Sequence, residues 1–276
     1  MDVDKFISDI LADLKTGHLH LPTLPQVALK INDIIVDPNA TAKAVAKVVG
    51  ADPALSARLI QAANSPLARA NHKVENVQTA VTRLGMLTVR NLVSSFLIRN
   101  MFHTRYPALK QRMLSLWNHS AQVAAISFVL ANKYTELKPD EAMLAGLIHD
   151  IGKLPIIAKA EEYPGLVKNP ASLDVVLDKL HARLGKVIVQ AWRFAPEFVT
   201  AVAEHENLQY EGEGIDLVDV VTVANLHSYA GKDHPLGRLN WAEVPAFKKL
   251  ELDPEASIAA LEEARQEIQQ IFQLLS

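Results

Sequence analysis

The recurrence of helix start and stop signals along almost the whole chain is the feature that most constrains its fold. In ADPALSARLIQAANSP, Asp52 is a typical N-cap, Pro53 is a typical first helical residue, and Asn64-Ser65-Pro66 is a typical stop. Apolar residues at helical spacing between these signals predict one buried face. Two helices are expected to meet at Gly85. Further helices are predicted over residues 41–49, 113–133, 139–149, 173–192, 196–204 and 254–275.

Strand signals are scarce. The stretch from Leu217 to Asn225 is β-branched enough to be ambiguous, but its neighbours are helical and no sheet partner is evident, so we interpret it as a buried helix. The chain has 276 residues, of which 49% are hydrophobic, and this is enough to bury a core. The sequence therefore predicts an all-α fold, with two helical lobes that divide near Tyr106-Pro107.

Composition excludes several classes of protein. Lys and Arg total 28 and Asp and Glu total 31, so the net charge of −3 argues against a general nucleic-acid binder. The absence of cysteine excludes disulfides, thiolate zinc sites and cysteine nucleophiles. The first ten residues are acidic where a signal peptide is basic, and residues 113–132 are too polar to span a membrane. We expect a cytoplasmic protein with neither nucleic acid nor a membrane as a partner.

The stretch GLIHDIGKLP, residues 146–155, holds the most informative side chains. Neighbouring residues of a helix project about 100° apart, so His149 and Asp150 reach one ion only at a helix end or a distortion. Gly152 offers flexible backbone at this point. A pair alone holds a divalent ion poorly. The further candidate ligands are His119, His181 and His205, each on a predicted helix.

Imidazole and carboxylate ligands suit iron, manganese, zinc or nickel, and a bound water of lowered pKa can attack a phosphoester. Taken singly, each of these histidines is more often an ordinary core or surface residue than a ligand. Lys153, after Gly152, either steadies a phosphate or is a solvated lysine at a helix end.

Five segments together resemble a known family. They are LPTLPQVALKI (21–31), ADPALSARLIQAANS (51–65), VQTAVTRLGMLTVRNLV (77–93), AGLIHDIGK (145–153) and the stretch from His181 to His205. In this order they resemble the HDOD family, the HD-related output domains of bacterial signalling proteins. That family is related to the HD superfamily of metal-dependent phosphohydrolases. The resemblance covers about residues 18–208. It implies an N-terminal helical lobe (about 1–106) packed on an HD-like lobe (107–208), which a helical extension (209–276) completes.

The resemblance also implies a regulatory role, because the family is mostly regarded as non-catalytic. Catalytic HD enzymes add a late aspartate, and by order along the chain Asn225 stands at that position, while Asp216 and Asp219 lie one to two turns upstream. Three alternatives stay open: a metal-free scaffold, a bound metal that stiffens the domain or senses a signal, and residual hydrolysis of a nucleotide or cyclic dinucleotide.

In the enzymatic alternative, His119, His149, Asp150 and Asn225 hold one ion, and His181 and His205 hold a second ion or the phosphate. The expected partners are signalling proteins in trans or a small nucleotide between the lobes. The seven-residue apolar spacing of the last predicted helix makes a homodimer a further possibility.

Overall fold

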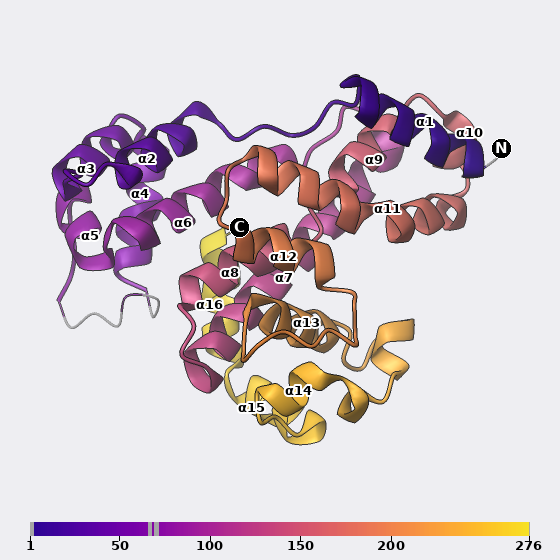
Figure 1. Ribbon diagram of the computed structural model, residues 1–276. Helices are drawn as coiled ribbons and strands as arrows, with labels where there is room; N and C mark the ends of the chain where they lie inside the picture. Colours follow the sequence, from indigo (N-terminus) through magenta and orange to yellow (C-terminus); the bar gives the residue numbers. More distant parts are fainter. Residues whose placement is uncertain (1–2, 66–67, 69–71, 276) are drawn as a thin grey trace.

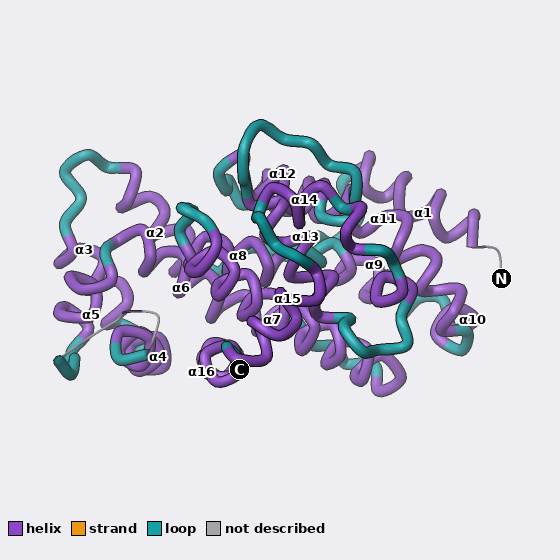
Figure 2. Tube along the Cα trace, turned by 90° about the horizontal axis from the view of Figure 1, so that it is seen from below, coloured by secondary structure: helices purple, strands orange, loops and turns teal. Residues whose placement is uncertain are grey.

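The computed structural model describes residues 3–65, 68 and 72–275, and every regular element among them is a helix (Figures 1 and 2). The all-α prediction is confirmed. The first lobe contains the helices α2 (Gln26–Val36), α3 (Ala42–Gly50), α4 (Pro53–Ala63), α5 (Val77–Leu84) and α6 (Met86–Ile98), followed by the 3-10 turn η2 (Arg99–Met101).

The predicted helix start and stop signals of the first lobe are confirmed where the structure describes them. The Asp52 carboxylate caps α4 by accepting from the backbone N–H of Ala54 at 2.8 Å and of Leu55 at 3.1 Å. Gly85, with a φ of +81°, joins α5 to α6 in a conformation that favours glycine. Pro66, the last residue of the predicted stop, lies outside the described residues.

The helix α1 (Val3–Thr16) departs from the predicted division into lobes. It lies far from α2–α5 and packs beside α11 (Pro170–Ala191) of the second lobe (Figure 1). The Phe6 ring meets the Tyr163 ring at 4.7 Å, and the Tyr163 hydroxyl donates to the Asp9 carboxylate at 2.8 Å. Burial of Phe6 fixes α1 there, so the first lobe does not include the start of the predicted 1–106 segment.

The second lobe is built around the 28-residue helix α7 (Pro107–Tyr134), which begins where the sequence predicted the division. The helices α8 (Pro139–Ile148), α13 (Leu217–Ser228) and α16 (Arg265–Leu275) pack on α7. The helical interpretation of Leu217–Asn225 is confirmed, since all of α13 is buried between other helices. The remaining helices are α9 (Lys153–Ala160), α10 (Pro164–Val167), α12 (Pro196–Glu204), α14 (Pro245–Lys249) and α15 (Pro254–Glu263), with 3-10 turns η3 (Pro235–Arg238) and η4 (Trp241–Glu243).

The prediction of one last helix over residues 254–275 is wrong. The chain breaks at Ala264, with a φ of −83° and a ψ of 5°, into α15 and α16. The seven-residue apolar spacing crosses this break, so it does not follow a single helix face. The apolar side of α16 is used within the chain, because this helix contacts α7 and α4.

The close approach of α9 to α11 determines how the HD stretch is held. Gly152 has an ordinary φ of −67°, so the flexible backbone expected there is not what the position requires. A Cβ at Gly152 would lie 1.9 Å from the carbonyl oxygen of His181 and 2.5 Å from the amide nitrogen of Gly185. The glycine is needed because two backbones touch at this point.

We expect Gly152→Ala to destabilise the protein by roughly 1–3 kcal/mol or more, because overpacking a rigid backbone contact costs about that much. Gly50→Ala is the matched control, since nothing lies within 4 Å of a Cβ at Gly50. Urea unfolding of both variants measures the difference. Equal stability of the two variants would contradict the described contact.

No helix in the described part of the chain is both long and apolar enough to cross a bilayer.

His227 joins α13 to α15 in the interior of the second lobe. Its Nε2 lies 3.0 Å from the Ser257 hydroxyl, and its ring packs on the Trp241 ring at 5.0 Å. Burial lowers the pKa of His227 to about 4. The unfolded chain takes up this proton below about pH 6.5, whereas the folded chain resists protonation until about pH 4, so stability falls as the pH drops through that window.

Between pH 7 and pH 5 we expect His227 to reduce the free energy of unfolding by about 2 kcal/mol. His227→Gln removes the titrating group and should flatten the pH dependence by that amount. His20→Gln, at an exposed position, should leave the pH dependence of the unfolding free energy as in wild type. Unfolding free energies of the three proteins at both pH values test this expectation, and parallel curves for wild type and His227→Gln would contradict it.

Candidate metal centre

The HD pair lies at the end of a helix, as its chemistry requires. The helix α8 ends at Ile148, and His149 and Asp150 begin the turn that leads into α9. The turn aims both side chains inward, with His149 Nε2 3.4 Å from Asp150 Oδ2. Both residues are almost completely buried.

Three further helices bring the other predicted histidines to this carboxylate. His119 comes from the middle of α7, and its Nε2 lies 3.6 Å from Asp150 Oδ2. His181 on α11 and His205 at the end of α12 approach the other oxygen, with Nε2 atoms 3.4 Å and 3.7 Å from Asp150 Oδ1. One carboxylate thus lies between two pairs of imidazoles.

The outer nitrogens of these rings are held by acceptors. Nδ1 of His149 donates to the Gly146 carbonyl at 2.7 Å, that of His181 to the Leu177 carbonyl at 2.7 Å, and that of His205 to the Val202 carbonyl at 3.0 Å. A carbonyl only accepts, so each Nδ1 carries a proton, and in the neutral form of each ring Nε2 presents a lone pair to the centre.

His119 follows the same rule through a hydroxyl. Ser228 Oγ donates to the Asn225 carbonyl at 2.7 Å and can therefore only accept from His119 Nδ1 at 3.4 Å. The Nε2 atoms of His119 and His149 lie 3.2 Å apart, as do those of His181 and His205. Two lone pairs facing at this distance repel unless a cation or a proton lies between them.

Burial disfavours the protonated form of two of these imidazoles. Desolvation lowers the pKa of His119 to about 3 and that of His181 to about 3. Burial alone would raise the pKa of Asp150, but the adjacent Lys153 ammonium holds it well below its usual range. Near neutral pH, His119 and His181 are therefore neutral imidazoles beside an ionised carboxylate.

This donor set fits a transition metal or zinc. Metal–nitrogen bonds of about 2.0–2.1 Å place two bound nitrogens about 3.0 Å apart at a right angle and about 3.4 Å apart at the tetrahedral angle. The two imidazole pairs, each with an Nε2 separation of 3.2 Å, fall within that interval. Asp150 Oδ1 is buried without a hydrogen-bond partner among the described residues, although an orphaned carboxylate oxygen is costly.

Two triads can be drawn on this geometry. One joins His119 and His149 to Asp150, and the other joins His181 and His205 to the same aspartate. Asp150 is common to both, so the carboxylate can bridge two adjacent positions for an ion. The five candidate ligands from the sequence are thus brought into one cluster.

Asn225 lies on the face of α13 that is turned toward the cluster. Thr222, one turn earlier, donates to the His205 carbonyl at 3.2 Å, and Ser228, one turn later, contacts His119. Asn225 is 5% exposed, and its Oδ1 finds no partner among the described residues. This register is consistent with the late-carboxylate position, and the role of Asn225 as a ligand stays a prediction.

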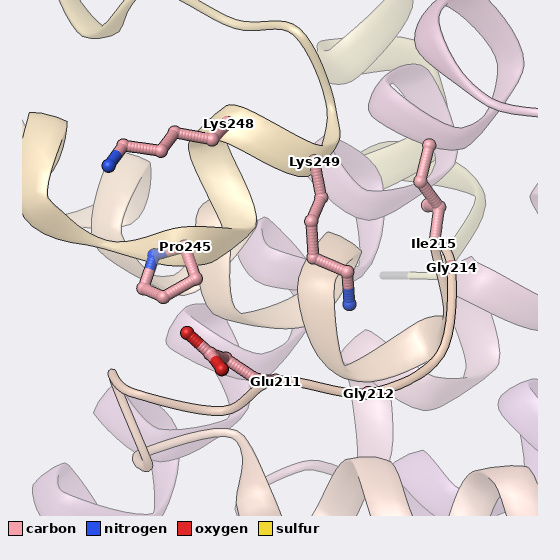
Figure 3. A pocket seen from close by; sticks show the side chains of 7 residues that line it. All are labelled: Glu211, Gly212, Gly214, Ile215, Pro245, Lys248 and Lys249. Atoms are coloured by element: carbon pink, nitrogen blue, oxygen red, sulfur yellow. The ribbon is translucent and has the colours of Figure 1, made fainter.

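The upstream aspartates are used elsewhere. Asp216 caps α13, and Asp219 closes the capping box and pairs with Lys249 at 2.5 Å. Lys249 lines a separate cavity of about 540 Å³ between the loop at residues 211–215 and α14, where its side chain descends toward the loop (Figure 3). Neither aspartate belongs to a triad of the cluster, in agreement with their expected register.

Lys153 is not the solvated lysine that one alternative predicted. Its side chain is 17% exposed, and its Nζ lies 2.6 Å from Asp150 Oδ2. Although burial lowers it, the pKa of Lys153 is raised overall by the adjacent Asp150 carboxylate. Lys153 therefore supplies the cluster with a fixed positive charge.

Glu206 is a member of the site that sequence reasoning missed. Its Oε1 lies 3.5 Å from His181 Nε2, while Glu204, which pairs with His205 in the sequence, turns away to accept from Asn207 at 3.0 Å. Desolvation raises the pKa of Glu206. The missed signal is the sequence EHE, in which either glutamate can face the histidine. Tyr229, whose ring packs on His119 at 5.3 Å, was also missed.

Known proteins share this architecture. The crystal structure of a "Putative metal-dependent phosphohydrolase" from Shewanella amazonensis SB2B superimposes with a TM-score of 0.85 at 28% identity, covering 99% of each chain. An HDOD domain protein from Geobacter sulfurreducens superimposes with a TM-score of 0.71 at 22% identity, covering 100% of this chain and 99% of that one. The second likeness shows the fold alone.

An uncharacterized protein of Treponema pallidum (strain Nichols) is 24% identical over 224 residues, covering 75% of this chain. The match spans 42% of that relative's length, so this chain corresponds to less than half of it. The HDOD domain model matches residues 21–208, close to the 18–208 expected from the sequence motifs. The chain therefore belongs to the HDOD domain family.

Proposed function

We propose that this chain is a metal-binding regulatory module of bacterial signal transduction, in which the His/Asp cluster holds a divalent cation. The observation that carries the proposal is the inward set of four Nε2 lone pairs around the Asp150 carboxylate. A metal-free scaffold needs donors between these acceptors. The Lys153 ammonium pairs with one oxygen of Asp150, and the other oxygen has no hydrogen-bond partner among the described residues. The second of the three alternatives from the sequence is thus the best supported.

In this function the ion joins α7, α8, α11 and α12 at one point. A metal bound in the folded state alone stabilises it by mass action. Loading of the site would set the rigidity of the second lobe, and a partner protein in trans or a small nucleotide would read that state. Iron, manganese, zinc and nickel all suit imidazole and carboxylate ligands.

Phosphoester hydrolysis is the second candidate. It is favoured by Lys153, a cation beside the proposed ligands that can also meet a phosphate, and by the name of the Shewanella relative. A bound divalent ion supplies a water of lowered pKa and polarises the phosphoryl oxygens. The neutral Asn225 weighs against it, because a carboxylate there would bind the ion more tightly.

Protein purified without added metal is expected to contain a divalent ion, as measured by elemental analysis. The double substitution His149→Ala, Asp150→Ala should remove it, because Asp150 contributes to both triads. The exposed His20→Ala should retain the wild-type content and serves as the control. Equal metal content in the double variant and wild type would refute the proposed site.

The substitution Asn225→Asp distinguishes the proposed regulatory function from phosphoester hydrolysis. If Asn225 stands at the late-carboxylate position, the new charge should tighten metal binding about 10–100-fold. It should also raise the rate of hydrolysis of bis-p-nitrophenyl phosphate with added manganese or iron, from a wild-type rate near background. A wild-type rate well above background that is lost in His149→Ala would instead favour the enzyme.

A further inference from the structure

We infer that the cluster holds a single ion, bound by His181, His205 and Asp150 Oδ1 beside the Glu206 carboxylate, while the His119–His149 position stays free of metal. This inference rests on the proposed metal-binding function and assigns the ion to one side of the cluster. The two triads have the same protein ligands by type, namely two imidazoles and a shared carboxylate. Their surroundings make them unequal.

The His119–His149 side already contains a cation. Lys153 Nζ lies 2.6 Å from Asp150 Oδ2, the oxygen that this side shares. A divalent ion bound to the same oxygen would lie within a few ångströms of the ammonium, where two positive charges in a dry interior repel strongly. Binding there requires Lys153 to leave a buried ion pair.

A second positive charge lies on this side. Lys232 Nζ is 6.0 Å from the centre of the Tyr229 ring, which itself packs on His119 at 5.3 Å. The α13 residues turned toward the cluster, Thr222, Asn225 and Ser228, carry no charge to offset either lysine. This half of the cluster therefore has one shared carboxylate oxygen, already paired, and two neighbouring cations.

Lys153 also acts on His181 and Glu206, but the His181–His205 side has more negative charge to offset it. Asp150 Oδ1 is buried and has no hydrogen-bond partner among the described residues, so one oxygen is free for an ion. Glu206 adds a second carboxylate, with Oε1 3.5 Å from His181 Nε2. The two imidazoles and the Asp150 oxygen lie close enough together for one ion of the kind that imidazole and carboxylate ligands suit, and the Glu206 carboxylate adds negative charge beside them.

Glu206 is the more exposed carboxylate on this side. Its side chain is 40% exposed, whereas those of His181 and Asp150 are 0% and 2% exposed. The Glu206 carboxylate comes from the turn after α12.

The test is a Co²⁺ titration of chelator-treated full-length protein, read by the visible absorption of the bound ion and by elemental analysis after desalting. Wild type should bind one ion per chain. His119→Ala should still bind one ion with affinity within about threefold of wild type. His181→Ala should lose it, and Glu206→Gln should weaken binding about 10–100-fold. Lys153→Met should admit a second ion, because it removes the ammonium from Asp150 Oδ2.

Circular dichroism checks the fold of each variant. If a buried histidine variant fails to fold, Glu206→Gln still tests the assignment, because Glu206 is partly exposed. The assignment would be overturned if His119→Ala lost the ion while His181→Ala retained it and Glu206→Gln bound it unchanged. The proposed function would then still stand. Two ions in wild type would also overturn it. No ion in folded wild type would overturn the proposed function together with the assignment.

Discussion

The second lobe depends on one buried carboxylate, Asp150, lying between two pairs of imidazoles whose Nε2 lone pairs face inward. An arrangement of acceptors without donors is unfavourable in an interior unless a cation compensates it. The fold fixes this arrangement through its backbone, since three of the rings donate Nδ1–H to carbonyls of their own helix or turn. The contact of Gly152 with the backbone of α11 then keeps the HD turn against His181.

The charges around this carboxylate determine what the site can do. Lys153 neutralises one oxygen, and the other stays orphaned, so the protein interior is neither fully satisfied nor symmetric. A neutral Asn225 on the facing helix keeps the total negative charge low. These features fit an ion that is bound and sensed better than a pair of ions that activates water, and they agree with the regulatory role that the family resemblance implies.

Much of this could be predicted from the sequence, because its signals are local. The caps at Asp52 and Gly85 and the helical reading of Leu217–Asn225 follow from propensity and periodicity, and are confirmed. The packing of α1 on α11 could not be predicted, since an amphipathic helix does not indicate which surface it will cover. The same reason explains Lys153 and Glu206: consecutive residues at a helix end point in different directions, and only the tertiary structure shows which of them reaches the cluster.

The most direct test is the protonation state of the four cluster histidines in the protein as purified, without added metal or chelator. Long-range ¹H–¹⁵N correlation spectra of ¹⁵N-histidine-labelled protein at pH 7 distinguish the two neutral tautomers from the imidazolium. We predict a protonated Nδ1 for His119, His149, His181 and His205, as their hydrogen bonds require, and an unprotonated Nε2 facing the ion. A protonated Nε2 in either facing pair would mean that the rings satisfy one another without an ion, and would contradict the central claim.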